Sequence, residues 1–176
     1  MKRTGILLVV LLCLLGVAPR EGGTAPEVIT DVGSFVTDIV RVATTVSDCG
    51  DADPATEIQF VTRNGTVVFT GAIAGAGQLS SNSLRDACSS PPAGTVQAQM
   101  QLQGATVGGV TGDLLIELEG VFDGDPTLPG GVRVRLHGTI TGVSGGLRNA
   151  RGRIQAAGPV TATGSLNAYY VEIRVK

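Results

Sequence analysis

Three long segments of the chain alternate between apolar and polar residues with a period of two. They are residues 95–102, 113–122 and 132–141. In the last segment Val132, Val134 and Leu136 share one face, while Arg133 and Arg135 lie on the other. A period of two is typical of β-strands that bury one face and expose the other. The pattern therefore predicts three half-buried strands.

Shorter segments extend this all-β pattern. We predict a hairpin in which strands 57–62 and 66–73 flank a turn at residues 63–65, because Asn-Gly favours the positive φ angles of a tight turn. Two further strands are predicted at residues 150–157 and 166–175. Residues 35–46 fit a helical stripe as well as a strand, but their density of Val, Ile and Thr favours a strand.

The predicted strands number about eight, at which a small antiparallel barrel closes around a filled interior. Closure also removes exposed sheet edges, and a two-sheet sandwich is the alternative. The segments without alternation are predicted to be loops at residues 48–55, 75–94 and 123–131. We predict one all-β domain over residues 26–176, a closed antiparallel barrel.

The N-terminal segment has the composition of a secretion signal. Two basic residues precede a ten-residue apolar run, residues 6–15, which is too short to span a membrane as a helix. Two sequences with the small residues of a cleavage site follow, one ending at Ala18 and one at Ala25, so the sequence does not decide between the two sites. We predict a signal peptide over residues 1–25, a secreted or periplasmic location, and no membrane association after cleavage.

The predicted mature chain keeps two cysteines, Cys49 and Cys88. Cysteine pairs of exported proteins are commonly oxidised in the compartments that these proteins enter. We therefore predict a disulfide, with two free thiols as the alternative. It would close a loop of about 40 residues, for which the chain-entropy model gives roughly 4 kcal/mol of stabilisation. The formal net charge of −2 lacks the basic footprint that nucleic acid requires, so we expect no nucleic-acid partner.

The most distinctive segment is a glycine-rich turn between two predicted strands, within residues 138–154. It resembles the G-G-T-G-x-F-x-x-A-x-G turn of dirigent-like and allene oxide cyclase-like β-barrels. The matching positions are Gly142, Ser144, Gly145, Leu147, Ala150 and Gly152, with Val143 in place of a glycine. The clear likeness covers residues 131–175 and is weak over residues 56–120.

This resemblance implies an eight-stranded antiparallel barrel with an internal cavity, often a dimer or trimer, in a bacterial secreted member of the family. Plant members of such families steer phenoxy-radical coupling or cyclise an allene oxide. Their catalytic residues lie outside the matched turn, and none can be carried onto a position of this chain.

Charged residues gather on two predicted strands that follow one another. Arg133, Arg135 and His137 share one face, and Glu117 and Glu119 lie on the polar face of the preceding strand. Such a ladder could be an acid–base or anion-binding site, or a row of cross-strand ion pairs in solvent. Because the apolar faces must be buried, we predict that these charges point outward.

Two acidic turns are the candidate metal sites. They hold Asp48, Asp51 and Asp53, and Asp123 and Asp125. Neither has the spacing of a calcium loop, and aspartates also start turns through their own backbone. We expect no metal and no cofactor.

The string G-x-S-x-G at residues 142–146 has the spacing of a nucleophile elbow. An elbow needs a following helix and a base, whereas a strand is predicted to follow here. The sole histidine, His137, lies on the predicted outward face. We predict a turn and no catalytic residue.

The apolar strand faces are expected to line the interior of the barrel. The predicted lining residues are Leu114, Ile116, Leu118, Val132, Val134 and Leu136. Apart from Tyr169, the apolar face of each recognised strand lacks a titratable group. We therefore expect a non-enzymatic barrel that binds a small apolar ligand, is packed shut, or serves as an extracellular structural module.

Two other functions stay open. One is an isomerase, cyclase or dirigent-type enzyme for a small hydrophobic substrate, with Tyr169, Tyr170 and Glu172 as the first candidate residues. The other is a surface assembly protein that forms a homo-oligomer through residues 35–46.

Overall fold

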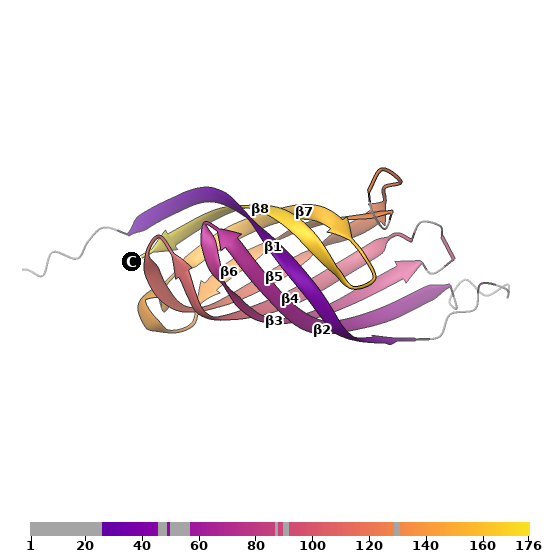
Figure 1. Cartoon of the computed structure of the whole chain (residues 1–176), viewed down its shortest axis with the longest axis horizontal. Coiled ribbons are helices and arrows are strands. Elements are labelled where there is room, and N and C mark those ends of the chain that lie inside the picture. The colour runs from indigo at the N-terminus through magenta and orange to yellow at the C-terminus, as the bar shows by residue number, and fades with distance from the viewer. Residues whose placement is uncertain (1–25, 46–48, 50–56, 87, 90–91, 129–130) are drawn as a thin grey trace, which may run out of the picture.

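The computed structural model describes residues 26–45, 49, 57–86, 88–89, 92–128 and 131–176. Its strands are β1 (Glu27–Thr44), β2 (Ile58–Gly71), β3 (Ile73–Asp86), β4 (Gly94–Val107), β5 (Val110–Gly124), β6 (Val132–Gly142), β7 (Arg151–Val160) and β8 (Gly164–Val175). Each strand pairs antiparallel with its neighbours in the chain, and β8 pairs with β1. The result is a closed barrel rather than a sandwich (Figure 1). The prediction of an all-β barrel is confirmed, and β1 confirms the strand interpretation up to Thr44.

Alternation places one face of every strand inside the barrel. Along β8 the burial pattern is strictly two-residue from Leu166 to Val175, with Tyr169, Val171 and Ile173 inside. The three alternating segments of the sequence lie within β4, β5 and β6, and their apolar faces point inward as predicted. The interior of the barrel is therefore built from the inward faces of all eight strands.

The predicted hairpin turn at Asn64 and Gly65 is wrong. Both residues lie in the middle of β2, opposite a bulge in β1 between Ile39 and Arg41. A Cβ at position 65 would lie 1.9 Å from the carbonyl oxygen of Asp38, so this glycine permits the close approach of two strands. The chain turns instead at Gly71, where φ is +97°.

The predicted loop at residues 75–94 is also wrong for most of its length. It contains β3 as far as Asp86, followed by a short connection to β4. The inward positions of β3 include Gly77, Ser81 and Ser83, which carry small or polar side chains. Such a strand shows no apolar alternation, and its pairing with β2 and β4 holds it in place. The predicted loop at residues 123–131 is confirmed for its described residues, 125–128 and 131, while 123 and 124 still belong to β5.

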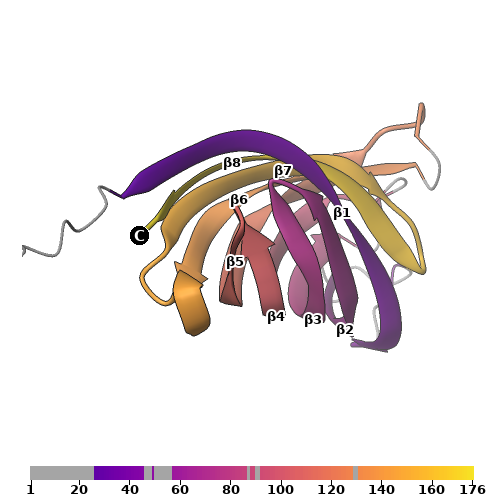
Figure 2. The ribbon, with the colours of Figure 1, turned by 60° about the vertical axis from the view of Figure 1, so that its left-hand side comes forward.

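The two ends of the barrel differ in their connections. We call the end with the β2–β3, β4–β5 and β6–β7 turns the turn end, and the opposite end, with the β1–β2, β3–β4, β5–β6 and β7–β8 connections, the loop end (Figures 1 and 2). The β6–β7 turn contains a short 3-10 helix, η2 (Gly145–Leu147). At the loop end a Cys49–Cys88 disulfide joins the β1–β2 and β3–β4 connections, with 5.5 Å between the Cα atoms. The disulfide predicted from the sequence is confirmed.

Candidate functional site

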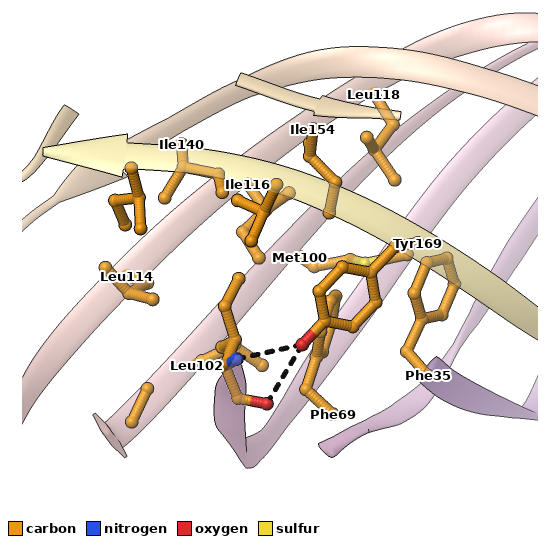
Figure 3. Close-up of a cluster of buried hydrophobic side chains, with 14 of the residues drawn as sticks. Phe35, Phe69, Met100, Leu102, Leu114, Ile116, Leu118, Ile140, Ile154 and Tyr169 are labelled. Carbon is orange, nitrogen blue, oxygen red and sulfur yellow. Dashed lines mark hydrogen bonds between the residues drawn. The ribbon is translucent and has the colours of Figure 1, made fainter. Parts of the chain in front are cut away.

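The turn end is filled by aromatic rings around Tyr169. The rings of Phe35 and Phe69 stack with centroids 4.8 Å apart, and Tyr169 lies 5.5 Å from Phe69 (Figure 3). The Tyr169 hydroxyl accepts a hydrogen bond from the backbone N–H of Ile73 at 2.8 Å. It can donate to the carbonyl of Thr70 at 3.1 Å or of Ile73 at 3.2 Å. Tyr169 thus fastens the β2–β3 turn onto the core, and burial raises the pKa of its hydroxyl.

The other two enzyme candidates of β8 lie on the outer surface. Tyr170 is 48% exposed, and Glu172 is also exposed, because both alternate with the inward residues of the strand. The structure therefore does not bring Tyr169, Tyr170 and Glu172 together.

Ser144 of the G-x-S-x-G string is bonded to a carboxylate. Its Oγ donates to Oδ2 of Asp113 at 2.6 Å, and the N–H of Gly104 donates to Oδ1 of the same residue at 2.9 Å. These two hydrogen bonds lower the pKa of Asp113. The three-residue helix η2 and then β7 follow Ser144, instead of the long helix of a nucleophile elbow. The string forms a turn, as predicted, and Asp113 ties that turn to the β4–β5 hairpin.

The charged ladder lies on the outside of the barrel, as predicted. Nε2 of His137 is 3.3 Å from Glu119, and Arg133 is 2.9 Å from Asp125. Arg135 pairs with Asp123.

The three cationic residues of the ladder are exposed, as are Glu117 and Glu119, whereas Asp123 and Asp125 are partly buried, so the ladder is a largely solvated surface. The remaining acidic residues of interest, Asp48, Asp51 and Asp53, lie outside the described residues.

A cavity of about 520 Å³ occupies the interior of the loop end. On one side its wall is apolar and comes from four consecutive strands. The residues of this wall are Val96, Ala98 and Met100 of β4, Phe122 of β5, Val132, Val134 and Leu136 of β6, and Val160 of β7. Among the described residues these four strands contribute only apolar side chains to the cavity.

Three of the six predicted lining residues, Val132, Val134 and Leu136, line this cavity. The other three, Leu114, Ile116 and Leu118, are buried in the packed core. Their positions follow from the antiparallel register. Leu114 lies opposite Gly142 near the turn end, whereas Phe122 lies opposite Val134.

The opposite wall carries all the polar side chains that the described strands present to the cavity. They are Ser165 and Asn167 of β8, Thr37 of β1, Arg63 of β2, and Ser83 and Arg85 of β3. These four strands are also consecutive in the barrel, because β8 pairs with β1. The cavity therefore has one apolar wall and one wall, called the polar wall here, that carries these polar side chains together with Phe35, Ile39 and Leu79.

Two arginines form the charged part of the polar wall. Arg63 donates from a guanidinium nitrogen to Oγ of Ser83 at 2.9 Å, and Arg85 donates from Nε to Oε1 of Gln59 at 2.6 Å. Both side chains are half-buried, and no described carboxylate lies within 4.0 Å of either guanidinium. Burial lowers the pKa of Arg63, and the positive charge of Arg85 lowers it further.

These arginines add titratable groups to the interior at positions outside the strands recognised in the sequence. The predicted hairpin turn includes Arg63 and the predicted loop at residues 75–94 includes Arg85, whereas both lie in strands. The sequence nevertheless contains a pattern that indicates one continuous strand around Arg63. Gln59, Val61 and Arg63 continue the same two-residue alternation as Val67 and Phe69, straight through Asn-Gly.

Asn167 provides an unused hydrogen-bonding group in the same wall. The residue is 1% exposed, and its Nδ2 donates to Oγ of Ser165 at 2.7 Å. Ser165 in turn bonds Oγ1 of Thr37 at 2.9 Å. Oδ1 of Asn167 has no hydrogen-bond partner among the described residues. Leaving such an acceptor unpaired costs about 1–3 kcal/mol, so this atom is available to a donor within the cavity.

Comparisons of the chain with models of known protein families, with curated proteins and with solved structures find no match. The likeness of the turn after Gly142 to dirigent-like barrels thus stays a prediction. In the described part of the chain, no helix has the length and apolar character needed to cross a membrane.

Proposed function

We propose that this barrel is an exported binding protein that holds a small, mainly apolar molecule in the cavity of its loop end. The supporting observation is the cavity itself. Its volume of about 520 Å³ falls in the range of small-molecule sites, which is roughly 300–1,000 Å³. Such sites combine apolar walls with a few polar groups that fix the orientation of the ligand, and this cavity has both.

The choice of side chains supports a bound ligand over a simple packing defect. At the turn end the same barrel is filled by large residues such as Phe69, Leu102 and Ile116. At the loop end small inward residues, among them Ala98 and Ser83, leave the space open. Eight strands can be filled by side chains, so the cavity follows from residue size and not from strand number.

Export is part of the same proposal. The Cys49–Cys88 disulfide is compatible with an oxidising compartment outside the cytoplasm. The predicted signal peptide lies outside the described residues and stays a prediction. A secreted or periplasmic carrier or scavenger of apolar molecules fits these features.

The neutral fluorescent probe N-phenyl-1-naphthylamine tests this proposal. We expect its fluorescence to rise saturably on addition of the purified protein, because the apolar wall would exclude water from the dye. The substitution Ala98→Phe places a ring in the cavity and should weaken binding strongly. Ala76→Phe adds the same ring at an exposed position and should leave binding unchanged. The proposal fails if the probe does not bind, or if both variants bind it equally well.

A second candidate function, self-assembly, is favoured by an apolar stripe on the outer surface. Its residues are Val32 and Val36 of β1, Val68 of β2, and Leu166 and Tyr170 of β8. Val36 lies opposite both Val68 and Leu166, so the side chains adjoin one another. Exposed apolar patches mark interaction sites, and one stripe is complementary to the stripe of a second copy. Light scattering should then show an oligomer that Val36→Lys dissociates, and a monomeric wild-type protein would exclude this function.

A further inference from the structure

We propose that the molecule bound in the loop-end cavity is an amphipathic carboxylate, a medium-chain fatty acid or a close relative, whose carboxylate is held by Arg63 and Arg85. This inference rests on the proposed function of the cavity and adds the chemistry of the ligand's head group. Three features of the cavity support it.

The first feature is that the polar side chains of the cavity's strands all lie on one wall, where Phe35, Ile39 and Leu79 lie among them. Strands β4 to β7 present apolar side chains, while the polar ones come from β8, β1, β2 and β3. A purely apolar ligand would leave the polar wall without partners, and a purely polar ligand would leave the apolar wall in contact with water. A molecule with one apolar and one polar part satisfies both walls.

The second feature is the sign of the charge. Arginine is the only titratable residue type among the described residues that line the cavity, and it occurs twice on adjacent strands. Ser83 and Gln59 give these guanidinium groups neutral acceptors, and no carboxylate among the described residues pairs with either charge. A half-buried pair of like charges is unfavourable, and a bound anion would compensate both.

The third feature is the geometry of the donors. Arg63 uses one guanidinium nitrogen on Ser83, and Arg85 uses Nε on Gln59, so each retains further N–H donors. A planar guanidinium fork matches the two oxygens of a carboxylate. Residues 63 and 81 are opposite one another, as are 59 and 85, so the two arginines lie on neighbouring strands. The burial and repulsion that lower the pKa of Arg63 would both be opposed by a carboxylate at this position.

Displacement of N-phenyl-1-naphthylamine by matched ten-carbon competitors tests the inference. The competitors are decanoate, decan-1-ol and decyltrimethylammonium, which share a chain and differ in head-group charge. We expect decanoate to displace the probe at a concentration about tenfold or more below that of decan-1-ol, which corresponds to one charge-assisted contact. The ammonium compound should be the weakest competitor.

Substitutions of the two arginines test whether they cause the preference for decanoate over decan-1-ol. Arg63→Gln and Arg85→Gln should each reduce the advantage of decanoate over decan-1-ol, and the double variant should abolish it. Arg153→Gln removes an exposed arginine of β7 and should leave the advantage unchanged. Binding of the neutral probe shows that each variant retains its cavity.

The outcomes separate the two proposals. If the probe binds but decanoate and decan-1-ol displace it equally well, the carboxylate inference is overturned and the apolar binding function stands. If the probe does not bind to the wild-type protein, the proposed function itself fails. The wild-type comparison decides the inference even where a variant does not fold, and an unchanged preference in the double variant would also overturn it.

Discussion

At the turn end of the barrel, the rings of Phe69 and Tyr169 fill the interior, whereas at the loop end Ala98 and its neighbours surround a cavity that the ring of Phe35 borders. The same eight strands build both ends, and the same alternation sends one residue in two inward. The difference lies in the size and polarity of the side chains at each level. The comparison shows that one sheet can divide its length between a closely packed part and a part that encloses a cavity.

The largest expected effect contrasts a residue of the packed end with one of the cavity wall. Phe69→Ala should lower the free energy of unfolding by about 3–5 kcal/mol, because it removes a ring from a closely packed cluster. Leu136→Ala should cost less, about 2 kcal/mol or below, because one side of Leu136 faces the cavity. Urea unfolding of both variants measures the difference. Equal losses would mean that the two ends are packed alike.

The disulfide gives the next largest effect, and it acts at the loop end. Replacing Cys49 and Cys88 together by serine should lower the free energy of unfolding by roughly 2–4 kcal/mol, since the link no longer restricts the unfolded chain. Thiol alkylation followed by mass spectrometry checks the bond itself. Two modifiable thiols from Cys49 and Cys88 in the non-reduced protein would contradict it.

A smaller effect comes from the Tyr169 hydroxyl at the turn end. Tyr169→Phe should cost about 1–3 kcal/mol, because the N–H of Ile73 loses its buried acceptor. The same change at the exposed neighbour Tyr170 should alter stability by less than about 0.5 kcal/mol. Binding of the neutral probe should be unchanged in both variants, since neither residue lines the cavity. A loss of probe binding in Tyr169→Phe would show that the two ends are coupled.

The pH dependence of stability follows from the same hydroxyl. Burial raises the pKa of Tyr169 above that of the unfolded chain, which is about 10. The folded state therefore binds this proton more tightly, so its contribution is complete below that value and is lost as the pH rises through the folded pKa. The wild-type protein should lose stability at alkaline pH more steeply than Tyr169→Phe. Parallel curves from unfolding at a series of pH values would contradict this assignment.

Much of the barrel could be predicted from the sequence, because β4, β5 and β6 carry an apolar residue at nearly every inward position. The parts of β2 and β3 that carry the two arginines of the polar wall were not recognised as strands, because their inward residues are not consistently apolar. Asn64 and Gly65 have the composition of a turn but lie within β2, opposite the bulge in β1. Several inward residues of β3 are small or polar. Small and polar residues stand there in place of the apolar pattern by which strands are recognised.

The position of the cavity along the barrel could not be predicted either. Leu118 and Leu136 look equivalent in their own strands, yet Leu118 pairs with Gly138 and belongs to the packed core. Leu136 pairs with Gly120, nearer to the loop end, and lines the cavity. Alternation tells which face is inside, but the register between strands decides at which level each side chain lies.

The most direct test of the account is a crystal structure of the protein with decanoate. We predict that the alkyl chain lies against Val134, Leu136 and Met100, with the carboxylate within hydrogen-bond distance of both Arg63 and Arg85. A loop-end interior with no room for the ligand, or decanoate bound only on the outer surface, would contradict the account.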